Sequence, residues 1–364
     1  MKIKPINLIA SCCILCAACN PFKIEIPDWG DYEHLDGLNV PSEVVYPEAG
    51  VLKTTTLLTS DFTKTTLAEG VYHYQYQKKD NITNANQFVN VLEIDLNNPD
   101  HYIRIISQSA DTTSAIAKSN NALAATNGTY EMPAVYVRIN GYNETEVSLD
   151  LNNPENASRY WKHNAALVGD GKNKYGIINA ARGAESSKEG GDAAIALYKR
   201  LPEKFILAGA PMLIDDYDPV GERFVPDGFT QSQLNALEYE DYRKHQGIRH
   251  PRTAVALTAD NDLLLVVADG RTSRADGFSA KELTKFLKKH FNPRWAVNLD
   301  GGGSSTMYIR DYNPTIKDSK GKVHGVVNYP TDDIKDANGK VIDSNKNDHY
   351  GQRKVRTHIL VMER

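Results

Sequence analysis

Two carboxylates in the second half of the chain are each followed at once by glycine. Asp300 opens the run Asp300–Gly301–Gly302–Gly303–Ser304–Ser305, and Asp269 precedes Gly270 and Arg271. Glycine lets backbone approach a ligand closely, and successive backbone N–H groups in such a turn can bind an anion. Paired carboxylates supply acid, base or nucleophile to a hydrolytic reaction. The pattern therefore predicts a hydrolytic site that accepts a negatively charged group.

The first element needed to position these residues is a β-hairpin. The runs 253–258 and 263–268 are rich in β-forming residues, and the turn residues Ala259–Asp260–Asn261–Asp262 join them. If Thr258 faces Leu263, Arg252 pairs with Asp269 at the far end of the hairpin. A cation and a carboxylate would then lie side by side.

The second element is a crossover that brings the two Asp-Gly pairs together. Ser279–Ala280–Lys281–Glu282 is a capping-box sequence followed by apolar residues at helical spacing, and Trp295–Leu299 is an apolar strand. The order of strand, helix and strand from Leu263 to Leu299 predicts parallel strands, whose carboxyl ends share one edge of a sheet. Asp269 and Asp300 should converge there, with Arg252 and Arg271 close by.

Structural explanations for the same residues stay open. The glycine and serine run is compatible with a tight turn and a helix N-cap, and Arg252 with Asp269 is compatible with a structural ion pair. A phosphate-binding P-loop would need a lysine before Ser304 or Ser305, and a nucleophile elbow would need a second glycine after Ser304. Neither motif is present. A calcium ion held by Asp269, Asp300 and backbone carbonyls also remains open, although no resident cofactor or metal is the primary expectation.

The amino terminus resembles a bacterial lipoprotein signal. Lys2 and Lys4 precede a short apolar run from Ile6 to Ala18, and all four cysteines lie before residue 20. Leu15–Cys16–Ala17–Ala18–Cys19 predicts cleavage before Cys19 and attachment of lipid to its sulfur; a simple secretory peptide is the alternative. We expect a signal peptide over 1–18, a Pro- and Gly-rich tether over 19–64, and a lipid-anchored protein of the bacterial cell envelope.

The remainder, 65–364, is expected to form one α+β domain. Its core would be a mixed, largely antiparallel β-sheet containing one βαβ crossover, with helices packed on the sheet. Two polar stretches, 142–192 and 311–350, are interpreted as long surface insertions. The net charge of −4 and the lack of a dense basic stretch exclude a nucleic-acid partner. The remaining expected elements are strands at 72–77, 88–96, 102–107, 134–139 and 204–207 and helices at 114–125 and 192–200.

Six segments of the chain follow one another in a recognisable order. They are Ala124–Tyr130, Gly209–Leu213, His250–Val255, Ala268–Thr272, Asn298–Met307 and Val327–Pro330. In this order they resemble the phosphodiester glycosidases, the family of the mannose 6-phosphate uncovering enzyme, over roughly 65–364. The resemblance implies hydrolysis of a sugar 1-phosphodiester at the anomeric carbon. It carries over to Asn127, Gly128, Arg252, Asp269, Asp300, Gly301, Gly302, Gly303, Ser304 and Asn328.

This chain departs from the family at one motif. The usual Asn-Gly-Gly-Phe is here Asn127–Gly128–Thr129–Tyr130, followed by Glu131. The lost glycine and the added carboxylate would alter the sugar pocket.

Roles follow from the chemistry of a phosphate leaving group. Arg252 and Arg271 would hold the phosphate, and amides of Gly301 to Ser304 would bind oxyanions. One of Asp300, Asp269 and Glu131 would act as nucleophile or general base, with Asp300 favoured. Thr253, Ser305 and Asn328 complete the expected substrate-binding set.

The expected substrate is a carbohydrate or phosphoglycan, an N-acetylhexosamine α-linked through phosphate in envelope or exopolysaccharide glycans. Two alternatives are a non-catalytic glycan-binding lipoprotein and a glycoside hydrolase acting on phosphate-free polysaccharide.

Overall fold

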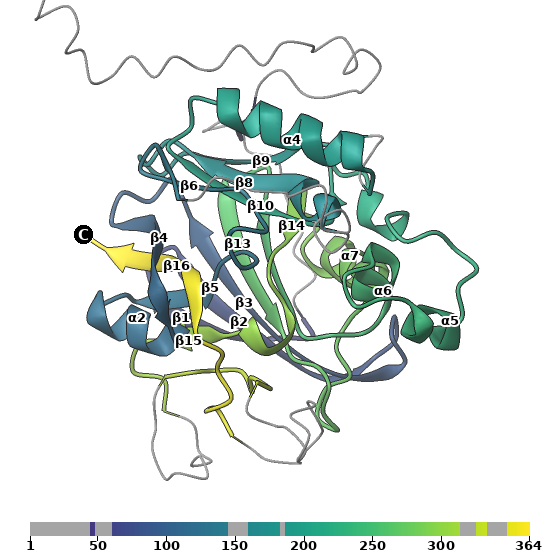
Figure 1. Ribbon diagram of the computed structural model, residues 1–364. Helices are drawn as coiled ribbons and strands as arrows, with labels where there is room; N and C mark the ends of the chain where they lie inside the picture. Colours follow the sequence, from purple (N-terminus) through teal and green to yellow (C-terminus); the bar gives the residue numbers. More distant parts are fainter. Residues whose placement is uncertain (1–43, 48–59, 145–158, 183–185, 314–324, 333–347) are drawn as a thin grey trace, which may run out of the picture. The chain divides into compact units, whose positions relative to one another are not determined.

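The computed structural model describes residues 44–47, 60–144, 159–182, 186–313, 325–332 and 348–364, all within one compact unit, Leu38–Arg364 (Figure 1). The predicted signal peptide, Cys19 and most of the tether lie outside the described residues, so these assignments stay predictions. No helix among the described residues is long and apolar enough to cross a membrane.

Three sheets form the framework, and every hydrogen-bonded pair of their named strands is antiparallel. The seven-stranded sheet has the order β1 (Thr63–Ala68), β2 (Val71–Asp80), β3 (Ala85–Asp95), β13 (Asp262–Ala268), β12 (Arg252–Leu257), β14 (Trp295–Asn298) and β11 (Met212–Ile214). The five-stranded sheet comprises β7 (Tyr142–Asn143), β6 (Val137–Ile139), β10 (Phe205–Gly209), β8 (Ala165–Gly169) and β9 (Tyr175–Asn179). The four-stranded sheet comprises β15 (Met307–Ile309), β5 (Ala124–Asn127), β16 (Val355–Glu363) and β4 (His101–Asp111).

Helices cover the sheets from outside. They are α2 (Thr113–Ser119), α4 (Lys188–Arg200), α5 (Gln231–Ala236), α6 (Tyr242–Gly247) and α7 (Ala280–His290), with short 3-10 turns η2 (Tyr160–His163), η3 (Val220–Glu222) and η4 (Gly302–Ser304). Figure 1 shows α4 along the five-stranded sheet and α2 beside the four-stranded one. The predicted α+β class, with helices packed on largely antiparallel sheets, is confirmed.

The central strands of the seven-stranded sheet are buried on both faces, and alternate residues of each strand point into different cores. In β12, Val255 and Leu257 join the main core with the other two sheets, whereas Ala254 and Ala256 join the core beneath α7. Leu283, Phe286 and Leu287 fill that second core from the helix. The capping box predicted at Ser279 is present, with reciprocal hydrogen bonds to Glu282.

The predicted crossover is present, with one strand inserted. β13, α7 and β14 follow one another, and β12 lies between the two strands and is antiparallel to both. β13 and β14 therefore run in the same direction, and their carboxyl ends lie at one edge of the sheet. This arrangement places Asp269 and Asp300 at the same edge, as predicted.

The predicted hairpin register is wrong by one residue. Arg252 pairs with Ala268, and Leu257 with Leu263. A shift of one residue moves side chains to the opposite face of a strand, so Arg252 and Asp269 are not cross-strand neighbours.

Two element assignments are also corrected. The predicted helix 114–125 ends at Ser119, because Ala124–Asn127 pairs as β5 between β15 and β16 in a buried sheet. The described part of segment 142–192 is not a surface insertion, since it contributes β8 and β9, whose residues are all buried. In both cases pairing with distant strands overrides the local pattern.

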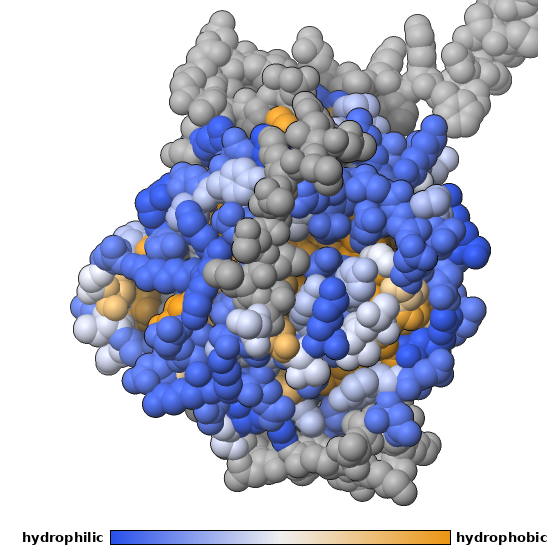
Figure 2. All heavy atoms as spheres, turned by 180° about the vertical axis from the view of Figure 1, so that it is seen from behind, coloured by the Kyte–Doolittle hydropathy of each residue, from blue (hydrophilic) through white to orange (hydrophobic). Residues whose placement is uncertain are grey.

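Most large apolar side chains of the described residues are buried. Figure 2, the view from behind, shows hydrophilic side chains over most of the visible described surface, with apolar side chains exposed in small areas. Among the described residues, the exposed large hydrophobic side chains are Val45, Tyr142, Phe229 and Tyr239.

Candidate active site

Asn127, at the end of β5, holds the backbone at Asp300. Its Nδ2 donates to the Asp300 carbonyl at 2.9 Å, and its Oδ1 accepts from Thr253 Oγ1 at 2.8 Å and from the Thr306 amide at 3.1 Å. Asn127 is fully buried. Three segments distant in sequence are thus joined by one amide side chain, which positions the loop after β14.

Replacing Asn127 by alanine is expected to lower stability by about 1–3 kcal/mol and kcat by more than roughly tenfold, because buried partners lose their bonds and Asp300 loses its support. Asn127→Asp keeps the acceptor for Thr306 but cannot donate to Asp300. Thermal unfolding and kcat should be measured for both. Wild-type kcat in Asn127→Asp would contradict the positioning role.

Asp300 follows β14 by two residues and is partly buried. Burial raises the pKa of Asp300 to about 6, and the charge of Glu131 adds to the rise; Ser304, Arg353 and Lys162 lower it. The Ser304 hydroxyl lies close enough to affect the carboxyl, but it makes no hydrogen bond of normal geometry among the described residues. Asp300 is therefore a carboxylate near neutral pH, held in a low-dielectric site beside cations.

Two arginine side chains lie against the glycine turn. A Cβ added at Gly302 would lie 3.2 Å from Arg271 Nη1, and one added at Gly303 would lie 2.8 Å from Arg353 Nη2. Gly302 also has a φ of +63°, which disfavours any side chain there. The positive φ therefore favours glycine at 302, and the two guanidinium groups lie directly on the turn beside Asp300.

Each of these arginines has a supporting partner. Arg271 donates from Nε and Nη2 to His250 Nδ1, at 3.2 and 3.0 Å. Arg353 donates from Nε and Nη2 to Asp332 Oδ1, at 2.8 and 2.6 Å. These bonds fix the two guanidinium groups against the turn.

Only some backbone amides of the glycine turn are available to bind an oxyanion. Gly302 N donates to the Pro251 carbonyl at 2.8 Å, Ser304 N to Gly301 at 3.3 Å and Ser305 N to Gly302 at 3.2 Å. The predicted oxyanion-binding role is therefore not supported for the Gly302 and Ser304 amides. The amides of Gly301 and Gly303 make no hydrogen bond to described residues.

Arg252 is a structural side chain, contrary to the prediction that it holds phosphate. It is 1% exposed, and its guanidinium donates to the carbonyls of Phe278, His245 and Ile248, at 2.8, 3.1 and 3.0 Å, and to Gln246 Oε1 at 2.7 Å. Burial lowers the pKa of Arg252 to about 10, so it is still a cation at neutral pH. Most of its N–H donors are thus bonded to groups of the protein itself.

Asp269 is also engaged by the protein. Oδ1 accepts from Asn328 Nδ2 and Oδ2 from the Tyr329 amide, both at 2.9 Å. Asn328 Nδ2 further donates to the Ser305 carbonyl, and its Oδ1 accepts from the Met307 amide, both at 2.9 Å. Burial raises the pKa of Asp269 to about 6. These bonds give Asp269 and Asn328 the role of tying the 325–332 segment to the sheet edge.

The other predicted substrate-binding residues are mostly internal supports. Thr253 Oγ1 also approaches Ser305 Oγ at 3.2 Å, and both residues are buried. Gly128 packs on Thr357, which leaves no room for a Cβ, and donates to the Thr357 carbonyl at 2.7 Å. Glu131 is exposed and close enough to influence Asp300.

Lys162 and Arg353 are two cations near Asp300 that the sequence did not predict as site residues. Lys162 lies in η2 and pairs with Glu240 at 2.7 Å, and both cations lower the pKa of Asp300. Neither stands in a glycine-rich or motif-like context, and they lie 138 and 53 residues from Asp300 in the chain. No local signal pointed to them, because only tertiary packing brings them to the glycine turn.

No group of three or more His, Cys, Asp or Glu side chains among the described residues is arranged to hold a metal ion. The calcium alternative combines Asp269 and Asp300 with backbone carbonyls, so it does not depend on such a group. It stays open to a direct test with a chelator.

The framework and its polar edge define an α+β protein with a carboxylate and arginine site. The family model of the phosphodiester glycosidases (NAGPA) matches residues 113–362, more than half of the chain. The chain belongs to the phosphodiester glycosidase family, whose members are hydrolases of phosphodiester-linked sugars. Its substrate is accordingly a carbohydrate.

Solved structures give weaker likenesses. The catalytic domain of zebrafish N-acetylglucosamine-1-phosphodiester alpha-N-acetylglucosaminidase, auto-inhibited by its pro-peptide, is 14% identical, with a TM-score of 0.49 over 88% of this chain and 87% of that chain. A hypothetical protein from Synechocystis is 14% identical, with a TM-score of 0.47 over 83% and 64%. No curated protein sequence matches the chain. Family membership rests on the sequence match.

Proposed function

We propose that this protein hydrolyses the glycosidic bond of a sugar 1-phosphodiester, with an N-acetylhexosamine α-linked through phosphate as the sugar. The observation that carries the proposal is the packing of Arg271 and Arg353 against the glycine turn that follows Asp300. Two guanidinium groups beside a partly buried carboxylate suit a substrate with phosphate next to the reacting carbon.

Arg271 and Arg353 hold the phosphate in this proposal, in place of Arg252. Their positive charges stabilise the negative charge that develops as the phosphate leaves. His250 and Asp332 keep the two side chains in place before substrate arrives. This pre-organisation reduces the entropy lost on binding.

Asp300 supplies the carboxylate at the anomeric carbon, as nucleophile or as the base that activates water. The bond between the anomeric carbon and the phosphate oxygen breaks, and its electron pair leaves with the phosphomonoester. Water provides the hydroxyl of the free sugar. Phosphate is a good leaving group once its charge is held, so a strong general acid is not needed.

We further propose that the protein acts on envelope or exopolysaccharide glycans while anchored by lipid at Cys19. The support is the signal-like amino terminus, with its basic start, short apolar run and terminal cysteine. Metabolic labelling with a fatty-acid analogue tests the anchor, because Cys19→Ser should abolish the label.

The reaction is tested by incubating the full-length protein with a set of sugar 1-phosphodiesters and following released sugar by mass spectrometry. N-acetylhexosamine α-1-phosphodiesters should be cleaved, and the matched phosphate-free glycosides should react at least roughly a hundredfold more slowly, because the arginines then have no anion to hold. Proton NMR of the first sugar released shows whether the anomeric configuration is retained or inverted.

Each alternative function predicts a different result in this experiment. Equal turnover of phosphate-free glycosides would contradict the phosphodiester assignment and favour an ordinary glycoside hydrolase. Binding without release of sugar would favour a glycan-binding lipoprotein. Unchanged turnover after treatment with EDTA is expected, and loss of turnover restored by calcium would establish the metal alternative.

A further inference from the structure

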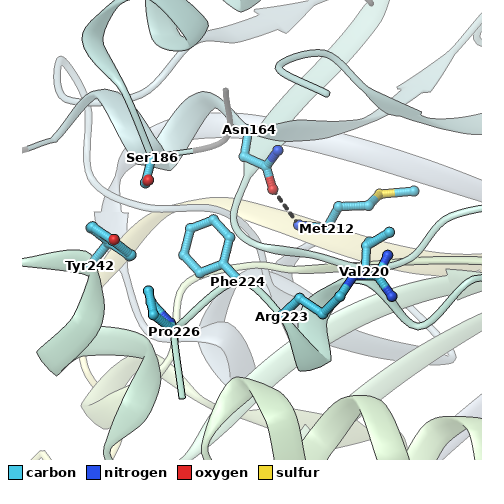
Figure 3. A pocket seen from close by; sticks show the side chains of 8 residues that line it. All are labelled: Asn164, Ser186, Met212, Val220, Arg223, Phe224, Pro226 and Tyr242. Carbon is cyan, nitrogen blue, oxygen red and sulfur yellow. Dashed lines mark hydrogen bonds between the residues drawn. The ribbon is translucent and has the colours of Figure 1, made fainter. Parts of the chain in front are cut away.

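A cavity lies between η3 and the start of α6. It has a volume of about 300 Å³ and is lined by Asn164, Ser186, Met212, Val220, Arg223, Phe224, Pro226 and Tyr242 (Figure 3). None of these residues belongs to the site described above. The volume is at the lower end of the range of ligand pockets, about 300–1,000 Å³, which suits one sugar ring.

The lining combines an aromatic face with polar groups around it. Figure 3 shows the Phe224 ring in the middle of the lining, with Tyr242 and Ser186 to one side and Met212 and Val220 to the other. Tyr242 meets Phe224 edge to face, with ring centroids 5.5 Å apart. Such a surface accepts the C–H face of a pyranose, while hydroxyl and amide groups at the margin hydrogen-bond its hydroxyls.

The fixed polar group is Asn164. It is 1% exposed, and its Oδ1 accepts from the Met212 amide at 2.6 Å while Nδ2 donates to Asn179 Oδ1 at 3.1 Å. These bonds hold the amide and the start of β11 in one arrangement. The cavity wall is therefore rigid at its base.

The charge in the lining favours a neutral ligand. Arg223 is the charged residue among those lining the cavity, and its guanidinium is already held by Asp218 through Nη1 to Oδ1 at 3.0 Å and Nη2 to Oδ2 at 2.7 Å. That pairing lowers the pKa of Asp218, so both groups are charged and cancel near neutral pH. An anionic sugar would gain little from this arginine.

Trp161 lies between the cavity and the catalytic edge. Its ring centroid is 6.5 Å from that of Phe224 and 5.1 Å from that of His245. Lys162, the next residue, is one of the cations that act on Asp300. Ring contacts through Trp161 thus connect the lining of the cavity with residues near the catalytic edge.

We propose that this cavity is a non-catalytic subsite for a neutral hexopyranose unit of a glycan. The Phe224 ring supports the apolar face of the sugar, Ser186 and Tyr242 lie near its hydroxyls, and Asn164 holds the base of the cavity in place. The subsite positions a glycan chain on the protein while hydrolysis occurs beyond Trp161. Binding here does not require Asp300, so it stands or fails separately from the proposed reaction.

Saturation-transfer NMR of the full-length protein with neutral methyl hexopyranosides, and with methyl glucuronide as the anionic comparison, tests the subsite. A dissociation constant on the order of 1 mM is expected for a ligand of this size. Phe224→Ala and the cavity-filling Val220→Phe should each weaken binding by roughly tenfold or more. The matched control is Phe229→Ala, which removes an exposed ring outside the cavity. Asp300→Asn should bind like wild type.

The subsite is established if sugar binding is weakened in Phe224→Ala and Val220→Phe but not in Phe229→Ala, and if thermal unfolding of Val220→Phe is unchanged. Absence of saturable binding by wild type overturns the proposal, as does equal binding by wild type and Val220→Phe. Loss of sugar binding in Asp300→Asn would place the sugar in the catalytic site and would also overturn the proposal. Tighter binding of the glucuronide than of the neutral sugars would contradict the assigned ligand class.

Discussion

The Asp300→Asn protein is expected to lose roughly 10²–10⁴-fold in kcat, because asparagine cannot serve as base or nucleophile. It should also be more stable than wild type by about 1–3 kcal/mol at pH 8, since a buried charge is removed. Turnover of an N-acetylhexosamine 1-phosphodiester and thermal unfolding between pH 4 and 8 provide the measurements.

The gain in stability should depend on pH with a defined sign. Burial raises the pKa of Asp300 from 3.8 to about 6, so the native state holds the proton more tightly than the unfolded chain. Ionisation therefore destabilises the native state progressively from about pH 4 to above pH 6. The stability advantage of the Asp300→Asn protein should be absent near pH 4 and complete above about pH 7.

The wild-type rate has a matching pH dependence. kcat should fall as the pH drops through about 6, because Asp300 is then protonated. Glu131→Gln is the companion variant, since removing that nearby charge should move the acidic limb to lower pH. A flat profile between pH 5 and 8, or full activity of Asp300→Asn, would contradict the role of Asp300.

Arginine substitutions should separate structure from catalysis. Arg252→Ala is expected to lower stability by about 3–5 kcal/mol and the Tm by roughly 5–15 °C, because three backbone carbonyls and Gln246 lose their buried donor. Arg271→Ala should fold with a smaller change in Tm but lose roughly 10–100-fold in kcat/KM, through the lost contact with phosphate. Thermal unfolding and steady-state kinetics on the same substrate distinguish these effects.

Arg353→Ala serves as the parallel test of the second cation and should resemble Arg271→Ala. An exposed arginine on β4, Arg104, supplies a matched control in Arg104→Ala, with unchanged kcat/KM expected for a small phosphodiester. Arg252→Ala with normal stability and poor activity would restore the original assignment of Arg252 to phosphate. Normal activity in both Arg271→Ala and Arg353→Ala would remove the main support for phosphate binding.

Local patterns predicted the elements whose signals are contained in a short stretch. The capping box at Ser279 and the apolar spacing after it specify α7, and the turn 259–262 specifies the hairpin of β12 and β13. The convergence of Asp269 and Asp300 followed from the order of strand, helix and strand. The insertion of β12 between the two strands, which keeps them parallel without pairing them, did not follow from that order.

Register and side-chain roles required distant contacts. A hairpin register that slips by one residue has nearly the same local sequence energy, and it is packing on both faces that selects the observed one. Ala124 and Ala125, at the end of the predicted helix 114–125, are extended in β5, because β15 and β16 supply the hydrogen bonds of that strand. The sequence predicted that Arg252 binds the substrate. In the folded protein its guanidinium donates instead to acceptors on Phe278, His245, Ile248 and Gln246.

The sequence by itself determined the family, the glycine turn and the carboxylate at Asp300, because these are carried by consecutive residues whose backbone requirements are local. Only the tertiary structure decided which cations face that carboxylate. Arg353 and Lys162 act on it from segments far away in the chain. Arg252 is nearer in sequence, but its guanidinium donates hydrogen bonds to backbone carbonyls. The physical reason is that hydrogen-bond satisfaction and burial depend on the neighbours each side chain finds after folding, which residue type and spacing do not specify.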